Sequence, residues 1–502
     1  MRKLIGNKEF YKRVLAISLP IMLQNGISNF VSMLDNIMVG RVGTEQMSGV
    51  SIVNQLIFIF YLCIFGAISG AGIFTAQFYG QKNMKGVRDT LRFKLIICLV
   101  ITAIAVTVMV VFQNPLISLY LHDGSATGDL AATLRYGKDY LWIMMIGLVP
   151  FAVEQSYSST LRETGETVVP MRASIIAVFV NLVLNYILIY GKFGMPVLGV
   201  QGAAVATVIA RFVQVAIVIA WAHTAHKVKD AELLSLGAAA PSSVEASLTS
   251  GAATPATSEA VLSGAVVKRK LPYIEGTYES LRVPWELVRK IAIMGLPLLI
   301  NEGLWAAGIA TQTQCYSNRG LSVIAALNIS STITNVFNIV FIALGDAVAI
   351  IVGQQLGSGE HEKARDTAYK IITFSVSTCV VIGSILFFVG PFFPDIYNTS
   401  VEVRDLAGNF IRCAAVCMPL HGYLHSTYFT LRSGGKTIIT FLFDSFFLWV
   451  VAVPLAYVLT HFTALNIVWI YLFCLLIEGI KVIIGTILLR SGVWMNTIVD
   501  DV

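Results

Sequence analysis

The first half of this sequence is repeated in the second half at a constant spacing. Pro20 returns as Pro297 and Gly80 returns as Gly357, and the register holds between these pairs without a gap. We call this the first repeat spacing. Shared apolar composition alone does not keep one register over such a length, so the repeat indicates two homologous halves. Two such halves in one apolar chain are typical of transporters, in which a site between the repeats faces either side of the membrane as they rock.

The composition predicts a polytopic membrane protein, because 56% of the residues are apolar and only 13% are charged. Soluble domains carry charge on about a quarter of their residues. Apolar stretches of about twenty residues, the length that crosses a bilayer, predict twelve spans. We place them at 14–39, 50–78, 93–113, 136–160, 168–190, 200–221, 287–315, 323–353, 369–393, 406–430, 438–460 and 465–489. The expected fold is all-α, with twelve transmembrane helices in two homologous six-helix lobes that form a parallel repeat.

The basic residues of the loops alternate between the two sides of the predicted spans. Loops 82–94 and 363–370 are rich in Lys and Arg and fall on the same side as both chain ends. Because Lys and Arg in short loops remain on the cytoplasmic side, both termini are predicted to be cytoplasmic. The expected location is the cell membrane, with multiple passes.

The chain is expected to contain an N-terminal lobe at 1–230, a cytoplasmic linker at 231–283 and a C-terminal lobe at 284–502. The central part of the linker, 236–265, consists almost wholly of Ala, Ser, Thr, Gly and Pro. A segment of this composition cannot bury a core of its own.

Carboxylates inside the spans are candidate functional residues, since an ionised carboxylate in hydrocarbon costs roughly 3 kcal/mol. Asp35 lies far along the first span, and the alternative to a functional role is a position near the interface, paired with Arg41. Glu302 lies five residues after Pro297 in the seventh span. Its alternative is a helix-start carboxylate favoured by the helix dipole.

Asn181 and Asn185 stand one helical turn apart in the fifth span, so their side chains point the same way. Their carbonyl oxygens suit a hard cation such as Na⁺, and they can also hydrogen-bond a protonated carboxyl group. Amides that pack one span against another are the competing interpretation.

His421 and His425 are also one turn apart, in the tenth span, but no Glu lies between them and no other His cluster accompanies them. We therefore predict no metal site and expect these histidines to line a polar cavity. Gln24 and Glu154 are further candidates for the wall of a substrate cavity.

Several motifs, in their order and spacing, resemble the multidrug and toxic compound extrusion (MATE) family. Pro20 is followed by Asp35 in Asp-Asn-Ile-Met-Val-Gly-Arg-Val-Gly, and the Leu-Arg-Glu-Thr-Gly-Glu-Thr motif at 161–167 has a counterpart at 431–437. Asn185-Tyr-Ile-Leu-Ile-Tyr-Gly runs into Gly199-Val-Gln-Gly-Ala-Ala. The resemblance covers both halves and omits only the linker.

The resemblance implies a secondary active exporter of organic, cationic and amphiphilic compounds, driven by a Na⁺ or H⁺ gradient. In that family the first-span Asp, here Asp35, is the main cation-responsive residue, and Asn181 is similar to its fifth-span partner. Some members carry a second Asp where this chain has Asn185. Glu302 looks like the seventh-span acid of another subgroup, whose tenth-span acids are missing here.

Two other functions are weighed against export. A flippase for lipid-linked oligosaccharides belongs to the same superfamily, but such proteins tend to have more charged cavities or extra spans. A membrane-embedded enzyme needs clustered His, Asp or Glu at one depth, which only His421 and His425 approach. We therefore expect a transporter without enzymatic activity or cofactor, acting on small organic molecules as a monomer, with no nucleic-acid partner.

The two halves differ in their buried polar residues. At the first repeat spacing, Asp35 faces Gln312 and Asn25 faces Glu302. The later spans follow a slightly shorter spacing, the one that relates the motif at 161–167 to that at 431–437, which we call the second repeat spacing. There Asn181 faces Val451. The cation site is therefore expected in the first lobe, with Glu302 as an isolated counterpart in the second.

Overall fold

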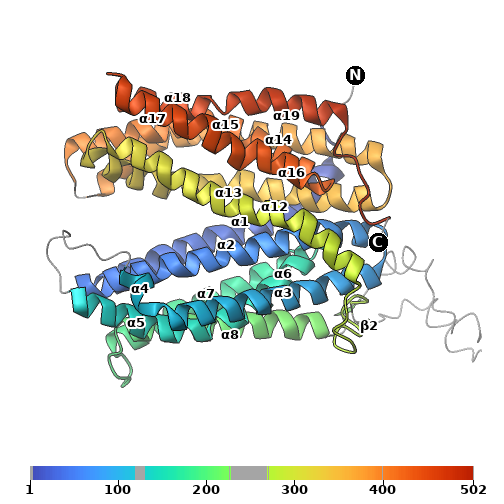
Figure 1. Cartoon of the computed structure of the whole chain (residues 1–502), viewed down its shortest axis with the longest axis horizontal. Helices are drawn as coiled ribbons and strands as arrows, with labels where there is room; N and C mark the ends of the chain where they lie inside the picture. Colours follow the sequence, from blue (N-terminus) through green and yellow to red (C-terminus); the bar gives the residue numbers. More distant parts are fainter. Residues whose placement is uncertain are drawn as a thin grey trace, which may run out of the picture. The chain divides into compact units, whose positions relative to one another are not determined.

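The computed structural model describes residues 4–118, 130–224, 226–227, 268–269, 271–397 and 399–500, and this part of the chain is almost entirely helical (Figure 1). The first half contains α1 (Lys8–Gly40), α2 (Thr44–Gly80), α3 (Met84–Val111), α4 (Gln113–Ser118), α5 (Leu130–Ile146), α6 (Leu148–Glu163), α7 (Val168–Tyr190) and α8 (Val200–His223). The second half contains α12 (Trp285–Ser317), α13 (Leu321–Gly357), α14 (His361–Val389), the 3₁₀ turn η2 (Gly390–Ile396), α15 (Val401–Ser433), α16 (Thr437–Phe441), the π-helical segments η3 (Leu442–Phe446) and η4 (Leu448–Ala452), α17 (Val453–Phe462), α18 (Ile467–Leu476) and α19 (Gly479–Ser491).

Two short strands, β1 (His226–Lys227) and β2 (Lys268–Arg269), pair antiparallel. They belong to a separate compact unit, Ile219–Leu281, whereas both sets of long helices belong to the other unit. The central part of the predicted linker, 236–265, lies outside the described residues.

The sequence repeat is also a repeat of helix lengths. Helices α1 and α12 both have 33 residues, and α2 and α13 both have 37 residues. The members of each pair begin and end at the first repeat spacing, and α3 and α14 also begin at that spacing. The prediction of two homologous helical lobes is therefore confirmed.

Ten helical segments of the described chain are long and apolar enough to cross a membrane. Two of the twelve predicted spans fall short of this. The predicted span at 136–160 is interrupted at Gly147, between the 17-residue α5 and the 16-residue α6. The predicted span at 406–430 lies within α15, which has 33 residues but carries charged residues near both ends and two histidines between them. The number of long apolar helices is lower than the number of predicted spans, because the first of these segments is interrupted and the second is a continuous helix with a higher polar content.

Each lobe packs around its second long helix. In the first lobe α2 contacts α3, α5 and α6, and in the second α13 contacts α14 and α15. Helix α2 also contacts α12 and α13, which joins the lobes (Figure 1). The outward faces expose large apolar side chains, among them Ile104, Phe179, Val381 and Ile483. Apolar faces of this extent are expected to contact lipid hydrocarbon.

The last two spans of the second lobe are irregular. Two π-helical segments, η3 and η4, precede α17, and Pro454 stands in its first turn. Proline lacks the N–H that an α-helix uses at this position, so the backbone spacing changes before it. The next span is broken between α18 and α19, where Ile477 and Glu478 form a turn.

Candidate functional site

Helices α1 and α7 lie side by side and are joined by a series of hydrogen bonds at nearly constant spacing in the sequence. Thr167 Oγ1 donates to the Ala16 carbonyl oxygen at 3.2 Å, and Tyr190 OH donates to the Met38 carbonyl oxygen at 3.1 Å. Two bonds between side chains lie between these ends. All four join residues 150 to 152 positions apart, so the polar residues of both helices meet along one seam.

Asp35 is held in this seam by the two asparagines predicted from the sequence. Asn185 Nδ2 donates to Asp35 Oδ1 at 2.6 Å and lies 3.2 Å from the side-chain amide of Asn181. The same amide contacts Thr207 Oγ1 at 3.2 Å. Both asparagines are buried, and Asn185 Oδ1 has no hydrogen-bond partner within the described chain. The structure thus brings Asp35, Asn181 and Asn185 together, and it shows no ion pair of Asp35 with Arg41 among the described residues.

The neighbours of Asn181 assign the orientation of its amide: the nitrogen faces Asp35, 3.0 Å from Oδ1 and 3.2 Å from Oδ2, and the oxygen accepts from Thr207 Oγ1 at 3.2 Å. Thr207 otherwise donates to the Ala203 carbonyl oxygen at 3.0 Å. Asn181 and Asn185 thus both direct an amide nitrogen at the Asp35 carboxylate.

Thr207, on α8, is a member of this site that the sequence did not single out. Threonines are common within apolar helices, where their hydroxyl groups bond to the preceding turn. Its position carried no signal until the fold placed it beside Asn181.

Gln24 and Glu154, both predicted to line a cavity, belong to one buried network. Gln24 Nε2 donates to Ser174 Oγ at 2.9 Å, and Gln214 Nε2 donates to the same oxygen at 3.0 Å. Gln214 also hydrogen-bonds Glu154, which accepts from Ser158 and, at 2.9 Å, from Gln155. Glu154 is 2% exposed, so this carboxyl group is enclosed by donors rather than open to solvent.

The second lobe has a polar pair at the position equivalent to Gln24 and Ser174. Asn301 Nδ2 donates to Asp444 Oδ2 at 3.0 Å, and Asn301 Oδ1 accepts from the Ser445 hydroxyl at 2.7 Å. Gln24 and Asn301 correspond at the first repeat spacing, and Ser174 and Asp444 correspond at the second. The repeat therefore preserves one polar contact between the first and fifth helices of each lobe.

Glu302 follows Asn301 and is partly buried on α12. The charged groups that act on its carboxyl group are Arg432 and Asp444. Glu302 therefore lies near Asp444 of the second-lobe polar pair and near Arg432, and the sequence indicated neither residue as its neighbour.

His421 and His425 lie on α15 in the second lobe, and Gln24 and Glu154 lie on α1 and α6 in the first. His421 Nε2 lies 3.6 Å from Glu478 Oε2, and the His425 ring meets the Phe341 ring edge-on at 4.8 Å. Glu478 Oε1 lies 3.5 Å from Lys481 Nζ. The sequence contained a signal for this pair, since both charges stand within the apolar stretch Leu475 to Ile484.

No group of three or more His, Cys, Asp or Glu residues is placed to hold a metal ion in the described segments.

At the end of the molecule that carries the basic loops, the lobes are joined by two equivalent glutamines. Gln77 Nε2 donates to the Ser433 carbonyl oxygen at 2.9 Å, and Gln354 Nε2 donates to the Glu163 carbonyl oxygen at 2.8 Å. The two donors correspond at the first repeat spacing and the two acceptors at the second. We call this reciprocal pair of bonds the glutamine latch.

Glycines allow the backbones to approach at the latch. A Cβ atom added to Gly80 would overlap the Gln354 carbonyl oxygen, and one added to Gly357 would overlap the Gln77 carbonyl oxygen. The C-terminal segment 492–500 adds to this contact, because Ile498 N donates to Gln77 Oε1 at 2.8 Å. The lobes are thus closed against each other at this end.

A buried ion pair supports the first-lobe side of the latch. Lys94 Nζ on α3 is fully buried, contacts the Glu163 carboxylate and lies 3.1 Å from Thr160 Oγ1. The carbonyl group of Glu163 is the one that accepts from Gln354. The ion pair therefore anchors the end of α6 that presents this acceptor.

Replacement of Lys94 by Met is expected to destabilise the protein by about 3–5 kcal/mol, because it leaves the Glu163 carboxylate without its counter-ion. The double variant with Glu163→Gln is expected to recover part of this loss. Melting temperatures in detergent measure both effects. Lys363→Met is the matched control, since its ion pair with Glu360 is exposed and contributes about 0–1 kcal/mol; equal losses for Lys94→Met and Lys363→Met would contradict the assignment.

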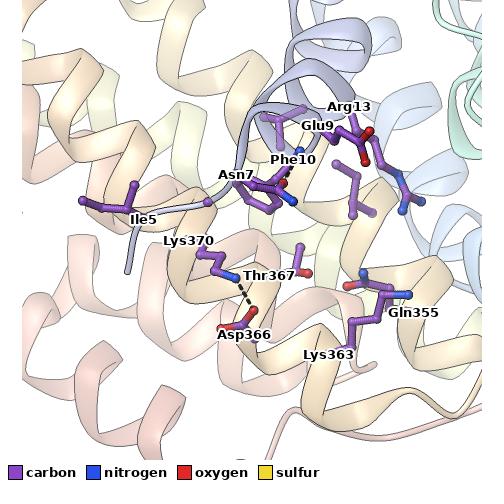
Figure 2. Close-up of a pocket in the computed structure, with 13 residues that line it drawn as sticks. Ile5, Asn7, Glu9, Phe10, Arg13, Gln355, Lys363, Asp366, Thr367 and Lys370 are labelled. Atoms are coloured by element: carbon purple, nitrogen blue, oxygen red, sulfur yellow. Dashed lines mark hydrogen bonds and ion pairs between the residues drawn. The ribbon is translucent and has the colours of Figure 1, made fainter. Parts of the chain in front are cut away.

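A pocket of about 590 Å³ lies beside the latch, between the start of α1 and helices α13 and α14 (Figure 2). Its charged lining residues are Glu9, Arg13, Lys363, Asp366 and Lys370, and Lys370 Nζ lies 2.5 Å from Asp366 Oδ2. Glu9 stands in the first turn of α1 and Asp35 in its last two turns, about 39 Å further along the helix. The pocket and the Asp35 site therefore lie at opposite ends of α1.

These features define a class of protein: a multi-pass helical membrane protein of two repeated lobes, closed at one end and with a carboxylate held by amides in its first lobe. Comparison with known proteins identifies the family within this class. The MatE family model matches residues 20–187 and 308–458, which is more than half of the chain. The protein belongs to the multidrug and toxic compound extrusion (MATE) family.

Curated relatives and solved structures match this chain over most of its length. The chain is 24% identical to "Probable multidrug resistance protein NorM" of Thermotoga maritima, covering 91% of this chain and 88% of that protein. It is 22% identical to "Probable multidrug resistance protein YoeA" of Bacillus subtilis, covering 90% and 88%. A structure described as the outward-facing conformation of a multidrug resistance MATE family transporter of the MOP superfamily matches with a TM-score of 0.77 and 17% identity, covering 97% of each chain.

Proposed function

We propose that this protein is a secondary active exporter of organic, cationic and amphiphilic compounds, which it antiports against Na⁺ or H⁺. The observation that carries the proposal is the Asp35 carboxylate, held by Asn185 and adjacent to Asn181 within an apolar lobe. A charge kept in such surroundings is a functional residue by default. The relatives are named as multidrug resistance proteins, which favours drug export over the lipid-linked oligosaccharide flippase.

The Asp35 site has the donor set that a small cation requires. Asp35 and Thr207 offer oxygen atoms, and the buried Asn185 Oδ1 has an unused acceptor within the described chain. Hard cations prefer such oxygen ligands. A proton on Asp35 would use the same neighbours, because an amide oxygen accepts a hydrogen bond from a protonated carboxyl group.

Coupling follows from competition for one negative charge. A proton or Na⁺ bound at Asp35 neutralises the carboxylate, and a cationic substrate attracted by that charge is then released. Each cation shifts the conformational equilibrium only by its difference in affinity between the two states. Asn185 and Asn181 both face Asp35, so neutralising the carboxylate weakens their charge-assisted hydrogen bonds and gives the helices α1 and α7 a means of responding to the change.

The glutamine latch supports alternating access between the lobes. The latch consists of a few hydrogen bonds, each worth about 0.5–1.5 kcal/mol, so thermal motion can open it. We propose that its end faces the cytoplasm, because the adjoining loops carry the basic residues, and that both termini lie there. Twelve spans, lobes at 1–230 and 284–502 with a linker at 231–283, and function as a monomer in the cell membrane complete the proposal.

Dye accumulation in everted vesicles tests the proposed function. An imposed Na⁺ or H⁺ gradient is expected to drive accumulation of a fluorescent organic cation, because everted membranes turn efflux into uptake. Applying the two gradients separately identifies the coupling ion. Vesicles without the protein set the background, and equal accumulation in both preparations under either gradient would rule the proposal out.

A further inference from the structure

The last span of the second lobe is broken at its centre by a charged residue. Ile467–Ser491 is an apolar segment of 25 residues, and Glu478 lies in the turn between α18 and α19. The turn is closed by Lys481 N, which donates to the Glu478 carbonyl oxygen at 2.9 Å. Ile477 and Glu478 keep right-handed helical backbone angles, so the irregularity is one tight turn, and a charged residue at such a point within an apolar span is a candidate functional residue.

The neighbouring span is also irregular beside this break. Asp444 lies in the π-helical segment η3 and accepts a hydrogen bond from Asn301. π-Helical turns are rare and frequently occur at functional sites. Two successive spans therefore depart from regular α-helix at the residue that carries a carboxylate.

Lys481 connects the two irregular spans. Its Nζ lies 3.5 Å from Glu478 Oε1, 5.3 Å from the centre of the Phe447 ring and 5.9 Å from that of Phe443. Asp444 is near enough to Lys481 for the two charges to interact. The Lys481 side chain is 7% exposed. One carboxylate and two aromatic rings around one ammonium group, with a second carboxylate nearby, are surroundings that suit a monovalent cation.

The first-lobe site differs from these surroundings of Lys481 because its described residues include no basic side chain. Asp35 is held by amides, and no Lys or Arg pairs with it in the part of the chain that the structure describes. Its negative charge is free for a mobile cation. In the second lobe the corresponding need for positive charge is met by a side chain.

We propose that the second lobe contains a monovalent-cation site, formed by Glu478, Phe443 and Phe447 with Asp444 nearby, whose resident cation is the ammonium group of Lys481. The chain supplies this cation itself, so the second lobe requires no mobile ion. His421 contacts the second oxygen of Glu478 and shares the same charge. The ligand class that the site would take without Lys481 is a small monovalent cation: methylammonium, Na⁺ or K⁺.

Removal of the lysine ammonium tests the proposal by creating a vacancy. Lys481→Met nearly keeps the length of the side chain and is made in an Asp35→Asn background, so that binding at the first-lobe site does not contribute. Methylammonium, Na⁺ or K⁺ is expected to raise the melting temperature of the purified variant in a saturable manner, by about 2 °C or more. Asp35→Asn alone is expected to show no such rise, and N-methylglucamine chloride at the same ionic strength controls for salt.

Glu478→Gln added to Lys481→Met distinguishes a cation site from a structural ion pair. The proposal requires this addition to abolish the response to the three cations. A response that persists without Glu478, or the absence of any response in Lys481→Met, would overturn it. Since no transport is measured, these outcomes are independent of the proposed efflux function.

The test also covers a variant that does not fold. Should Lys481→Met be recovered as folded protein only when methylammonium, Na⁺ or K⁺ is present during purification, the added cation has replaced the ammonium and the proposal is supported. Recovery of only the charge-neutral variant with Glu478→Gln, whatever the salt, would show that the site accepts no free cation.

Discussion

Asp35→Asn is expected to abolish ion-driven efflux while the protein remains folded and inserted. Asparagine has nearly the same volume but no charge, so it neither attracts a cationic substrate nor binds Na⁺ or a proton as a carboxylate does. Because the charge is what both cations compete for, efflux is expected to fall to the background of vesicles without the protein. Dye accumulation in everted vesicles under separate Na⁺ and pH gradients measures the loss.

The repeat supplies a matched control for this variant. Gln312 occupies the position equivalent to Asp35 in the second lobe, and Gln312→Asn is expected to retain efflux. Size-exclusion profiles and membrane content establish that both variants fold. Full dye accumulation by Asp35→Asn under either gradient would contradict the role of Asp35 as the coupling residue.

Valine at Gly80 or Gly357 is expected to prevent closure of the latch end. A side chain at either position overlaps a carbonyl oxygen of the other lobe, and backbone cannot move aside as a flexible side chain does. Overpacking of this kind costs about 1–3 kcal/mol or more, which shifts the equilibrium between closed and open states by about 5–150-fold. Efflux is expected to fall because one of the two alternating states is no longer reached.

Hydrogen exchange of the C-terminal segment 492–500 reports the opening. The Ile498 amide is protected by Gln77 Oε1 in the closed arrangement, so exchange there is expected to accelerate in Gly80→Val and Gly357→Val. Gly303→Val is the control, because no atom outside its own helix lies within 4 Å of a Cβ at that position. Unchanged exchange in both latch variants, together with normal efflux, would refute the latch.

The repeat made the lobe architecture predictable. Pro20 and Pro297 do lie inside equivalent helices, and the helix bounds of α1 and α12 repeat at the spacing read from the sequence. The interruption of the span at 136–160 could not be predicted in the same way. Its apolar content is continuous across Gly147, whereas the helix is interrupted there, next to the Arg211 side chain from α8. Hydropathy measures composition and does not detect such a break.

The polar residues likewise include some that the sequence identified and some that it did not. Asp35, Asn181 and Asn185 were identifiable because charges and paired amides are rare in apolar spans, and they meet in the structure. Thr207 was not, because its type is common in membrane helices. The pairing of Asn301 with Asp444, equivalent to that of Gln24 with Ser174, also became visible only when α12 and η3 were placed side by side.

By itself the sequence determined the duplication and the apolar helices, since these properties depend on residue type and spacing along one chain. Tertiary structure alone decided which partners the polar residues have. The glutamine latch joins residues 356 and 191 positions apart, and the surroundings of Lys481 depend on a helix break and on rings from the preceding span. Hydrogen bonds and ion pairs act over a few ångströms in space, and only the packing of the helices brings such distant residues within that range.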